Sequence, residues 1–161
     1  FLSRWDGATM DKVPNHIRDK LGFAIGQQTY KAYRDTLASD RWQRLANLGA
    51  RPQRLLFAST GTKDPKASDV LYIAALAAPN TIDTIPEKTL LAFADHGKLA
   101  GTLPRDGGDC ETVLGLFRKA GIDLERLAAD LQSQGAKSFD ESWQNLLGAI
   151  ETKGKELQHA S

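Results

Sequence analysis

Two short apolar segments, each followed by a helical pattern, constrain the fold of this chain most strongly. The first covers residues 54–59 (RLLFAS), between a proline and a glycine, and the second covers residues 81–85 (TIDTI). A short, nearly continuous apolar run such as the first is typical of a strand buried on both faces of a parallel sheet. Helical patterns follow at residues 69–77 and 87–96. Strands that alternate with helices form right-handed parallel βαβ units, so the sequence predicts an α/β fold.

The opening segment, residues 1–6 (FLSRWD), has the pattern of the C-terminal end of a third buried strand. It carries no initiator methionine and no polar lead-in, so the chain does not begin like a complete domain. Helices are expected at residues 14–37 and 40–48, the second of which ends at Gly49. Three strands cannot close a barrel and would leave sheet edges exposed, so we expect part of this fold to lie outside the sequence.

The remainder of the chain is predicted to be helical after a Gly- and Pro-rich loop at residues 101–108. A Ser-x-x-Glu capping box at Ser138 and Glu141 predicts the start of the last helix. The expected helices cover residues 110–119, 124–131 and 138–150. We divide the chain into a segment of a barrel (residues 1–100) and a C-terminal helical extension (residues 101–161) that packs on it within the same domain.

Charge and cysteine content exclude several classes of function. The 161 residues contain 21 Lys and Arg against 20 Asp and Glu, and this near-balance gives no basic stripe for nucleic acid or an anionic membrane. No apolar run approaches the roughly 18 residues of a membrane-spanning helix. The single cysteine, Cys110, can form neither an internal disulfide nor a zinc site, and the histidines share no ligand spacing. We expect a cytoplasmic protein that binds no metal, no nucleic acid and no membrane.

Polar residues follow the predicted strands, where parallel α/β folds place their functional sites. The segment from Ser59 to Lys63 (STGTK) combines hydroxyls, a glycine and a cation, which suits an oxyanion, although the same composition also fits a plain polar turn. Arg4 can bind a phosphate bidentately or pair with a structural carboxylate. Asp83 can act as an acid or base, or it can orient a loop.

These segments resemble transaldolases, specifically the longer bacterial type. The opening residues resemble the end of the sixth strand of their (β/α)8 TIM barrel, and the later motifs resemble the seventh and eighth strands with their helices. The matching motifs are FLSR at residues 1–4, LLFASTGTKDP at 55–65, SDVLY at 68–72, PNTIDTIPEKTL at 79–90, DHG at 95–97 and AGID at 120–123. The resemblance therefore covers the C-terminal portion of the barrel, from strand six to the terminal helices.

The resemblance implies transfer of a dihydroxyacetone unit from sedoheptulose 7-phosphate to glyceraldehyde 3-phosphate through a lysine Schiff base, in the pentose phosphate pathway. The family's lysine and its acid/base carboxylates lie on earlier strands, so no catalytic residue is expected in this chain, and no cofactor is implied. Arg4 and Ser59 match phosphate-binding residues of the family. Shorter transaldolases place a second arginine where this chain has Gly61, and Lys63 is the nearest cation, so Lys63→Ala in a complete enzyme is expected to raise KM for phosphorylated substrates.

Two other interpretations remain open at this stage. The first is another Schiff-base sugar-phosphate aldolase barrel, and the second is a non-catalytic fragment that acts as a binding or assembly module. The expected partners are sugar-phosphate substrates and the N-terminal part of the barrel, on the same or a separate chain. We expect this chain alone not to turn over substrate.

Overall fold

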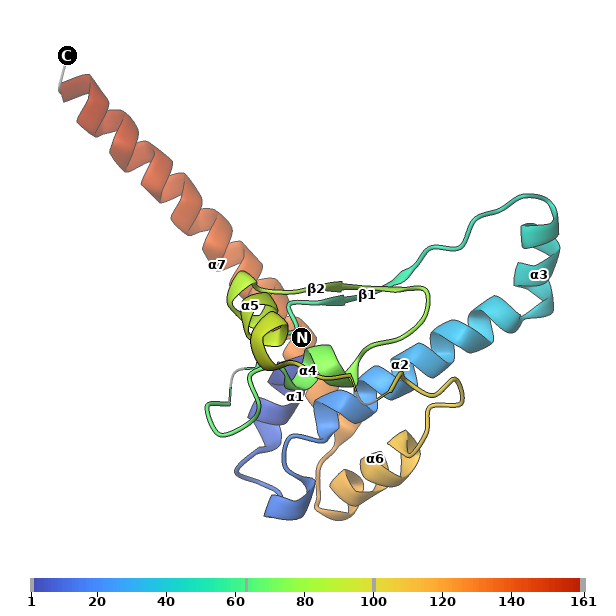
Figure 1. Cartoon of the computed structure of the whole chain (residues 1–161). Helices are drawn as coiled ribbons and strands as arrows, with labels where there is room; N and C mark the ends of the chain where they lie inside the picture. The colour runs from blue at the N-terminus through green and yellow to red at the C-terminus, as the bar shows by residue number, and fades with distance from the viewer. Residues whose placement is uncertain (1, 63, 100, 160–161) are drawn as a thin grey trace. The chain divides into compact units, whose positions relative to one another are not determined.

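The computed structural model describes residues 2–62, 64–99 and 101–159, and the chain divides into two compact units, Phe1–Ile122 and Asp123–Ser161. The second unit is one long helix, α7 (Leu124–His159). The elements of the first unit are α1 (Leu2–Thr9), the 3-10 helix η1 (Asn15–Ile17), α2 (Leu21–Ala38), α3 (Asp40–Asn47), β1 (Leu55–Ala58), α4 (Leu71–Ala75), β2 (Thr81–Thr84), α5 (Glu87–His96) and α6 (Cys110–Lys119) (Figure 1). Within the described ranges, none of the helices combines the length and hydropathy that crossing a lipid bilayer requires.

Strands β1 and β2 form a two-stranded parallel sheet and are connected through α4. In the register, Leu55 pairs with Thr81 and Ala58 pairs with Thr84. This arrangement confirms the parallel βαβ unit and the strand positions predicted from the two apolar segments. The predicted helices at α3, α5 and α6 are also present, and Gly49 has the positive φ of +94° that suits the residue after a helix end.

Only one face of this sheet is covered by the first unit. Phe57 points into the core and is 5% exposed, whereas Leu56 is 46% exposed and Ile82 on the neighbouring strand is 40% exposed. The prediction that the first strand is buried on both faces is therefore wrong for the described residues. Core residues of α2 and α4 pack with Phe57 on one side of the two strands, and a second covering layer is not among the described elements.

The core under the covered face joins α2, β1, α4 and the loop that precedes α6. Its buried members are mostly aromatic and leucine side chains: Tyr30, Phe57, Tyr72, Leu76 and Leu103. Tyr30 also donates a hydrogen bond to the carbonyl of Pro79 (3.4 Å), which fixes the turn before β2. Burial of such large side chains supplies most of the stability of a small unit, at about 25 cal/mol per Å² of apolar surface.

The N-terminal segment corrects the prediction of a strand end at residues 1–6, because Leu2–Thr9 forms helix α1. A strand needs a neighbouring strand for its backbone hydrogen bonds, whereas a helix satisfies these groups within the segment. The helix also buries Trp5, Asp6 and Thr9. These contacts lie largely against α2 and favour the helix over a third strand.

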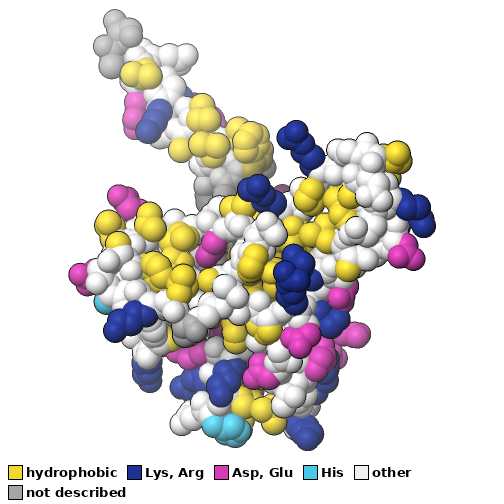
Figure 2. All heavy atoms as spheres, turned by 45° about the vertical axis from the view of Figure 1, so that its right-hand side comes forward, with side chains coloured by type: hydrophobic (Ala, Val, Ile, Leu, Met, Phe, Trp, Pro, Cys, Tyr) yellow, Lys and Arg dark blue, Asp and Glu magenta, His cyan; other side chains and the backbone are white. Residues whose placement is uncertain are grey.

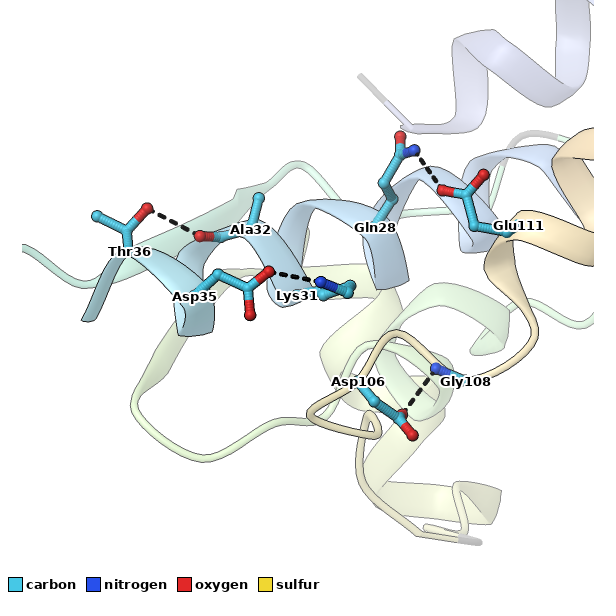
Figure 3. A network of polar contacts seen from close by, with 8 residues as sticks. All are labelled: Gln28, Lys31, Ala32, Asp35, Thr36, Asp106, Gly108 and Glu111. Carbon is cyan, nitrogen blue, oxygen red and sulfur yellow. Dashed lines mark hydrogen bonds and ion pairs between the residues drawn. The ribbon is translucent and has the colours of Figure 1, made fainter. Parts of the chain in front are cut away.

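Helix α2 is the central element of the first unit, since it packs against both α1 and α6. Polar contacts along its exposed side include a hydrogen bond from Gln28 Nε2 to Glu111 Oε1 of α6 (2.9 Å) and an ion pair between Lys31 and Asp35 (2.5 Å) (Figure 3). The Cys110 thiol at the start of α6 is buried, and burial raises its pKa.

The second unit corrects another prediction, because residues 124–131 and 138–150 belong to a single helix, α7. The capping box at Ser138 does not begin a helix, and the Ser138 carbonyl instead accepts a hydrogen bond from the Ser142 hydroxyl one turn later (2.8 Å). No proline interrupts the intervening residues, and a single glycine costs only about 1 kcal/mol in a helix. The exposed apolar side chains of α7 recur at helical spacing: Phe139, Trp143, Leu146, Leu147 and Ile150.

Candidate functional site

A cavity of about 310 Å³ lies where α1, the loop after β1 and the first turn of α5 meet. Two of the three residues predicted from the sequence, Arg4 and Ser59, line it together although they are far apart in the chain. The third, Lys63, lies outside the described residues. The described lining residues are Ser3, Arg4, Ser59, Gly61, Thr62, Pro86, Lys88 and Thr89.

The lining of this cavity favours an anion. Among the described lining residues, Arg4 and Lys88 are cations, four others carry hydroxyl groups, and none carries a carboxylate. Cations and hydroxyls offer hydrogen-bond donors, and a charge-assisted hydrogen bond to an anion is about twice as strong as a neutral one. On the face drawn in Figure 2, basic and acidic side chains are interspersed.

The loop after β1 is hydrogen-bonded to the C-terminal end of β2. Ser59 has a positive φ of +54°, in the left-handed region that non-glycine residues seldom adopt. Its backbone N–H donates to Thr84 Oγ1 (3.1 Å), and the next N–H, of Thr60, donates to the Thr84 carbonyl (3.3 Å). These bonds tie the loop to the end of β2 and account for the unusual backbone angle of Ser59.

Gly61 allows this loop to approach α5 closely. A Cβ atom at this position would lie 3.1 Å from Pro86 Cγ and 3.3 Å from Thr89 Oγ1, which is tighter than an ordinary van der Waals contact. A larger side chain would have to move the first turn of α5. The close approach brings the hydroxyl-bearing loop and α5 to the same cavity.

Arg4 reaches the cavity because α1 is anchored by a buried carboxylate. Asp6 is 3% exposed and accepts hydrogen bonds from the backbone N–H of Gly22 (3.0 Å) and from the Tyr72 hydroxyl. Burial raises the pKa of Asp6, against the opposing effect of these hydrogen bonds. The Asp6 carboxyl therefore fixes the position of α1 through its hydrogen bonds, and Arg4 of the same helix lines the cavity.

Lys88 is a charged lining residue that sequence reasoning missed, as it also missed Pro86 and Thr89. It occupies the first turn of α5, two residues after Pro86, which provides no side-chain cap. A lysine in the first turn opposes the helix dipole, which favours negative charge there. Glu87 in the same turn offsets this effect, so the sequence alone does not single out Lys88, and its place in the cavity follows from the packing of the loop after β1 on this turn.

A second, smaller cavity of about 190 Å³ has the opposite character. Its lining includes Asp6, Asp19 and Asp64, and it shares Thr62 with the first cavity. Burial and, second, the charge of Asp64 raise the pKa of Asp19. Despite these carboxylates, the part of the chain that the structure describes holds no group of three or more His, Cys, Asp or Glu residues arranged for a metal ion.

The remaining candidates lie away from the cation-lined cavity. Asp83 sits in β2 opposite Phe57, half-buried, and burial raises its pKa. His96, at the C-terminus of α5, forms exposed ion pairs with Asp69 (2.9 Å) and Asp95 (3.2 Å). The hydrogen bonds to these two aspartates raise the pKa of His96.

Comparison with known proteins identifies the family. The sequence model of the Transaldolase/Fructose-6-phosphate aldolase family matches residues 1–150. The chain belongs to this family. The resemblance found in the strand-end motifs is thereby confirmed.

Curated transaldolases cover nearly the whole chain, but the chain covers less than half of each of them. It is 39% identical over 158 residues to the transaldolase of Frankia alni, which spans 93% of the chain and 43% of that protein. It is 40% identical over 159 residues to the transaldolase of Mycolicibacterium smegmatis, with coverage of 94% and 43%. For the transaldolase of Neisseria meningitidis the identity is 37% over 150 residues, with coverage of 93% and 43%.

Proposed function

We propose that this chain forms the phosphate-binding side of a transaldolase. This proposal rests mainly on one observation: Arg4 and Ser59 line the same cavity, whose described lining contains further hydroxyl groups and no carboxylate. The reaction is the transfer of a dihydroxyacetone unit from sedoheptulose 7-phosphate to glyceraldehyde 3-phosphate, which belongs to the pentose phosphate pathway in the cytoplasm. The family relationship supports this reaction, because the curated relatives carry the name transaldolase.

The chemistry divides between two parts of the enzyme. A lysine outside this chain forms a Schiff base with the ketose carbonyl, and the resulting iminium accepts the electron pair when the adjacent carbon–carbon bond breaks. The phosphate lies at the other end of the substrate. Arg4 and Ser59 hold that end, so that binding energy far from the reacting carbons positions the carbonyl next to the lysine. Neither a metal nor an organic cofactor takes part in this scheme.

The proposed architecture is a (β/α)8 barrel in which β1 and β2 are strands seven and eight. The exposed face of these strands, with Leu56 and Ile82 about half uncovered, supports the presence of a further layer in the complete enzyme. The relatives' greater length also supports it, since the chain matches only 43% of the transaldolase of Frankia alni. The partner of this chain is therefore the N-terminal part of the barrel, joined to it or supplied as a separate polypeptide.

A chimeric enzyme tests this proposal. The N-terminal part of the Mycolicibacterium smegmatis transaldolase that the alignment leaves uncovered is joined to residues 1–161, and erythrose 4-phosphate formation is measured. We expect the chimera to be active and the chain alone to be inactive. Borohydride reduction in the presence of fructose 6-phosphate is expected to add mass to a peptide of the N-terminal part and to none from this chain.

Substitutions in the chimera test the phosphate role. Arg4→Ala and Ser59→Ala are expected to raise KM for fructose 6-phosphate, with the larger effect for Arg4 because its hydrogen bond is charge-assisted. A folded chimera that traps the Schiff base but releases dihydroxyacetone without an acceptor would indicate an aldolase instead. A folded chimera that neither reacts nor traps substrate would indicate a non-catalytic module.

A further inference from the structure

We propose that Lys88 is a second cation of the phosphate site and that it holds the phosphate together with Arg4. This inference rests on the proposed phosphate-binding function and adds a residue to that site. Arg4 comes from α1, whereas Lys88 comes from the first turn of α5, and both line the same cavity of about 310 Å³.

The surroundings of Lys88 give it no competing partner in the cavity. The described lining contains hydroxyls, a glycine and a proline, and no carboxylate that could neutralise either cation. Glu87 precedes Lys88 in α5 but does not line the cavity. Two cations facing one cavity repel each other, so an anion between them removes that repulsion as well as binding to each.

Lys88 shares the first turn of α5 with the acidic Glu87, and an anion bound in front of that turn would add a second favourable charge. A cation in the first turn of a helix opposes the dipole, whereas an anion in front of that turn interacts favourably with both the dipole and the lysine. Thr89, one residue further, is 8% exposed and also lines the cavity. The first turn of α5 therefore presents a cation and a hydroxyl to the same ligand.

Packing at Gly61 supports the same assignment. A Cβ atom added at Gly61 would lie within 3.3 Å of both Pro86 and Thr89, so the loop after β1 packs directly on the first turn of α5. That turn therefore forms a wall of the site. A side chain at residue 61 would fill the space between the loop and this wall. Lys88 of α5 supplies a cation on this side of the cavity, where Gly61 has no side chain.

A phosphate monoester in its dianionic form is the ligand that two cations suit best. Its second pKa lies near 6, so the dianion predominates above about pH 7. We expect the chain to bind inorganic phosphate and fructose 6-phosphate more tightly at pH 7.5 than at pH 5.5, and not to bind fructose. Loss of one cation should reduce this preference for the higher pH.

The test titrates the full 161-residue chain with inorganic phosphate and, as a second probe, with fructose 6-phosphate. Binding is measured from the NMR signals of the backbone amides. Lys88→Met is expected to weaken binding about tenfold, which corresponds to the loss of one charge-assisted contact of about 1.4 kcal/mol. Lys88→Arg keeps the cation and is expected to bind within about twofold of the wild type. Lys98→Met is the matched control, because Lys98 is exposed and follows the same helix without lining the cavity.

The outcomes separate this inference from the proposed function. If Arg4→Met abolishes phosphate binding while Lys88→Met and Lys98→Met bind as the wild type does, the phosphate site stands and the role of Lys88 is overturned. If the wild-type chain shows no saturable phosphate binding, the proposed function and this inference both fail. Far-UV circular dichroism of each variant confirms that binding is compared among folded proteins.

Discussion

The contact between α1 and α2 at Gly22 allows a sharp prediction, because this contact holds the helix that carries Arg4. A Cβ atom at Gly22 would lie 2.5 Å from Asp6 Oδ2 and 2.7 Å from the backbone oxygen of Leu2. The backbone of Leu2 cannot rotate away as a side chain can. Gly22→Ala must therefore move α1 from α2 and break the hydrogen bond from the Gly22 N–H to Asp6.

The magnitude follows from three contributions. Overpacking of a tight contact costs about 1–3 kcal/mol, and loss of a hydrogen bond to a buried group costs about 1–3 kcal/mol. Alanine is favoured over glycine in a helix by about 1 kcal/mol, which offsets part of the loss. With the middle of each range, we expect Gly22→Ala to lower the free energy of unfolding by about 3 kcal/mol. Urea unfolding followed by near-UV circular dichroism measures it.

Gly115 provides the matched control. It lies in α6, and a Cβ atom there would meet no other atom within 4 Å. Gly115→Ala is therefore expected to raise the free energy of unfolding by about 0.5–1 kcal/mol through helix propensity alone. If Gly22→Ala stabilises the chain as Gly115→Ala does, the proposed anchoring of α1 is refuted. A destabilised Gly22→Ala variant should also bind phosphate more weakly, since α1 positions Arg4.

Three further predictions concern single groups. Burial raises the pKa of Asp6, so the folded chain favours the protonated carboxyl. The stability that this group contributes is fully present below its ordinary pKa of 3.8 and is lost as the pH rises through the raised pKa. Urea unfolding from about pH 4 to pH 7 should therefore show a declining free energy of unfolding in the wild type and a flatter profile in Asp6→Asn. The hydrogen bond to Asp69 is the main cause of the raised pKa of His96, so Asp69→Asn should move that pKa back toward 6.5, as measured by NMR titration of the ring protons. Ser59→Gly and Ser59→Ala both remove the hydroxyl, but only glycine avoids the cost of about 1–2 kcal/mol that a side chain meets at positive φ. The glycine variant should therefore be about 0.5–1 kcal/mol more stable than the alanine variant in urea unfolding. Equal stability would show that the backbone of Ser59 is not strained.

The elements that sequence reasoning predicted correctly are those whose signals are local. Residues 55–58 and 81–84 form strands because short apolar segments bounded by turn residues have few alternatives, and residues 87–96 form a helix directly after a proline. The errors concern segments whose structure depends on partners. Residues 2–9 form α1, since no strand is available beside them and α2 offers a surface to bury Trp5.

The site could be predicted only in part for a related reason. Ser59 follows a predicted strand, and Arg4 and Ser59 lie in motifs that resemble those of the family, so both could be proposed from the sequence. Lys88 could not, because a lysine after a helix start usually points to solvent, and only the packing of Gly61 against Pro86 shows that this turn lines a cavity. The sequence also gives no sign that α1 would bring Arg4 there from a helix.

The close packing at Gly61 has a consequence for how sequences of this family vary. An arginine at this position, which the resemblance implies for the shorter transaldolases, would require Pro86 or Thr89 to shift, since their atoms lie 3.1 Å and 3.3 Å from the place of its Cβ. Position 61 and the first turn of α5 are therefore coupled, and neither can change freely while the other stays. We expect the two positions to covary among relatives, with a cation at position 88 accompanying glycine at position 61, and its loss tolerated where position 61 is arginine.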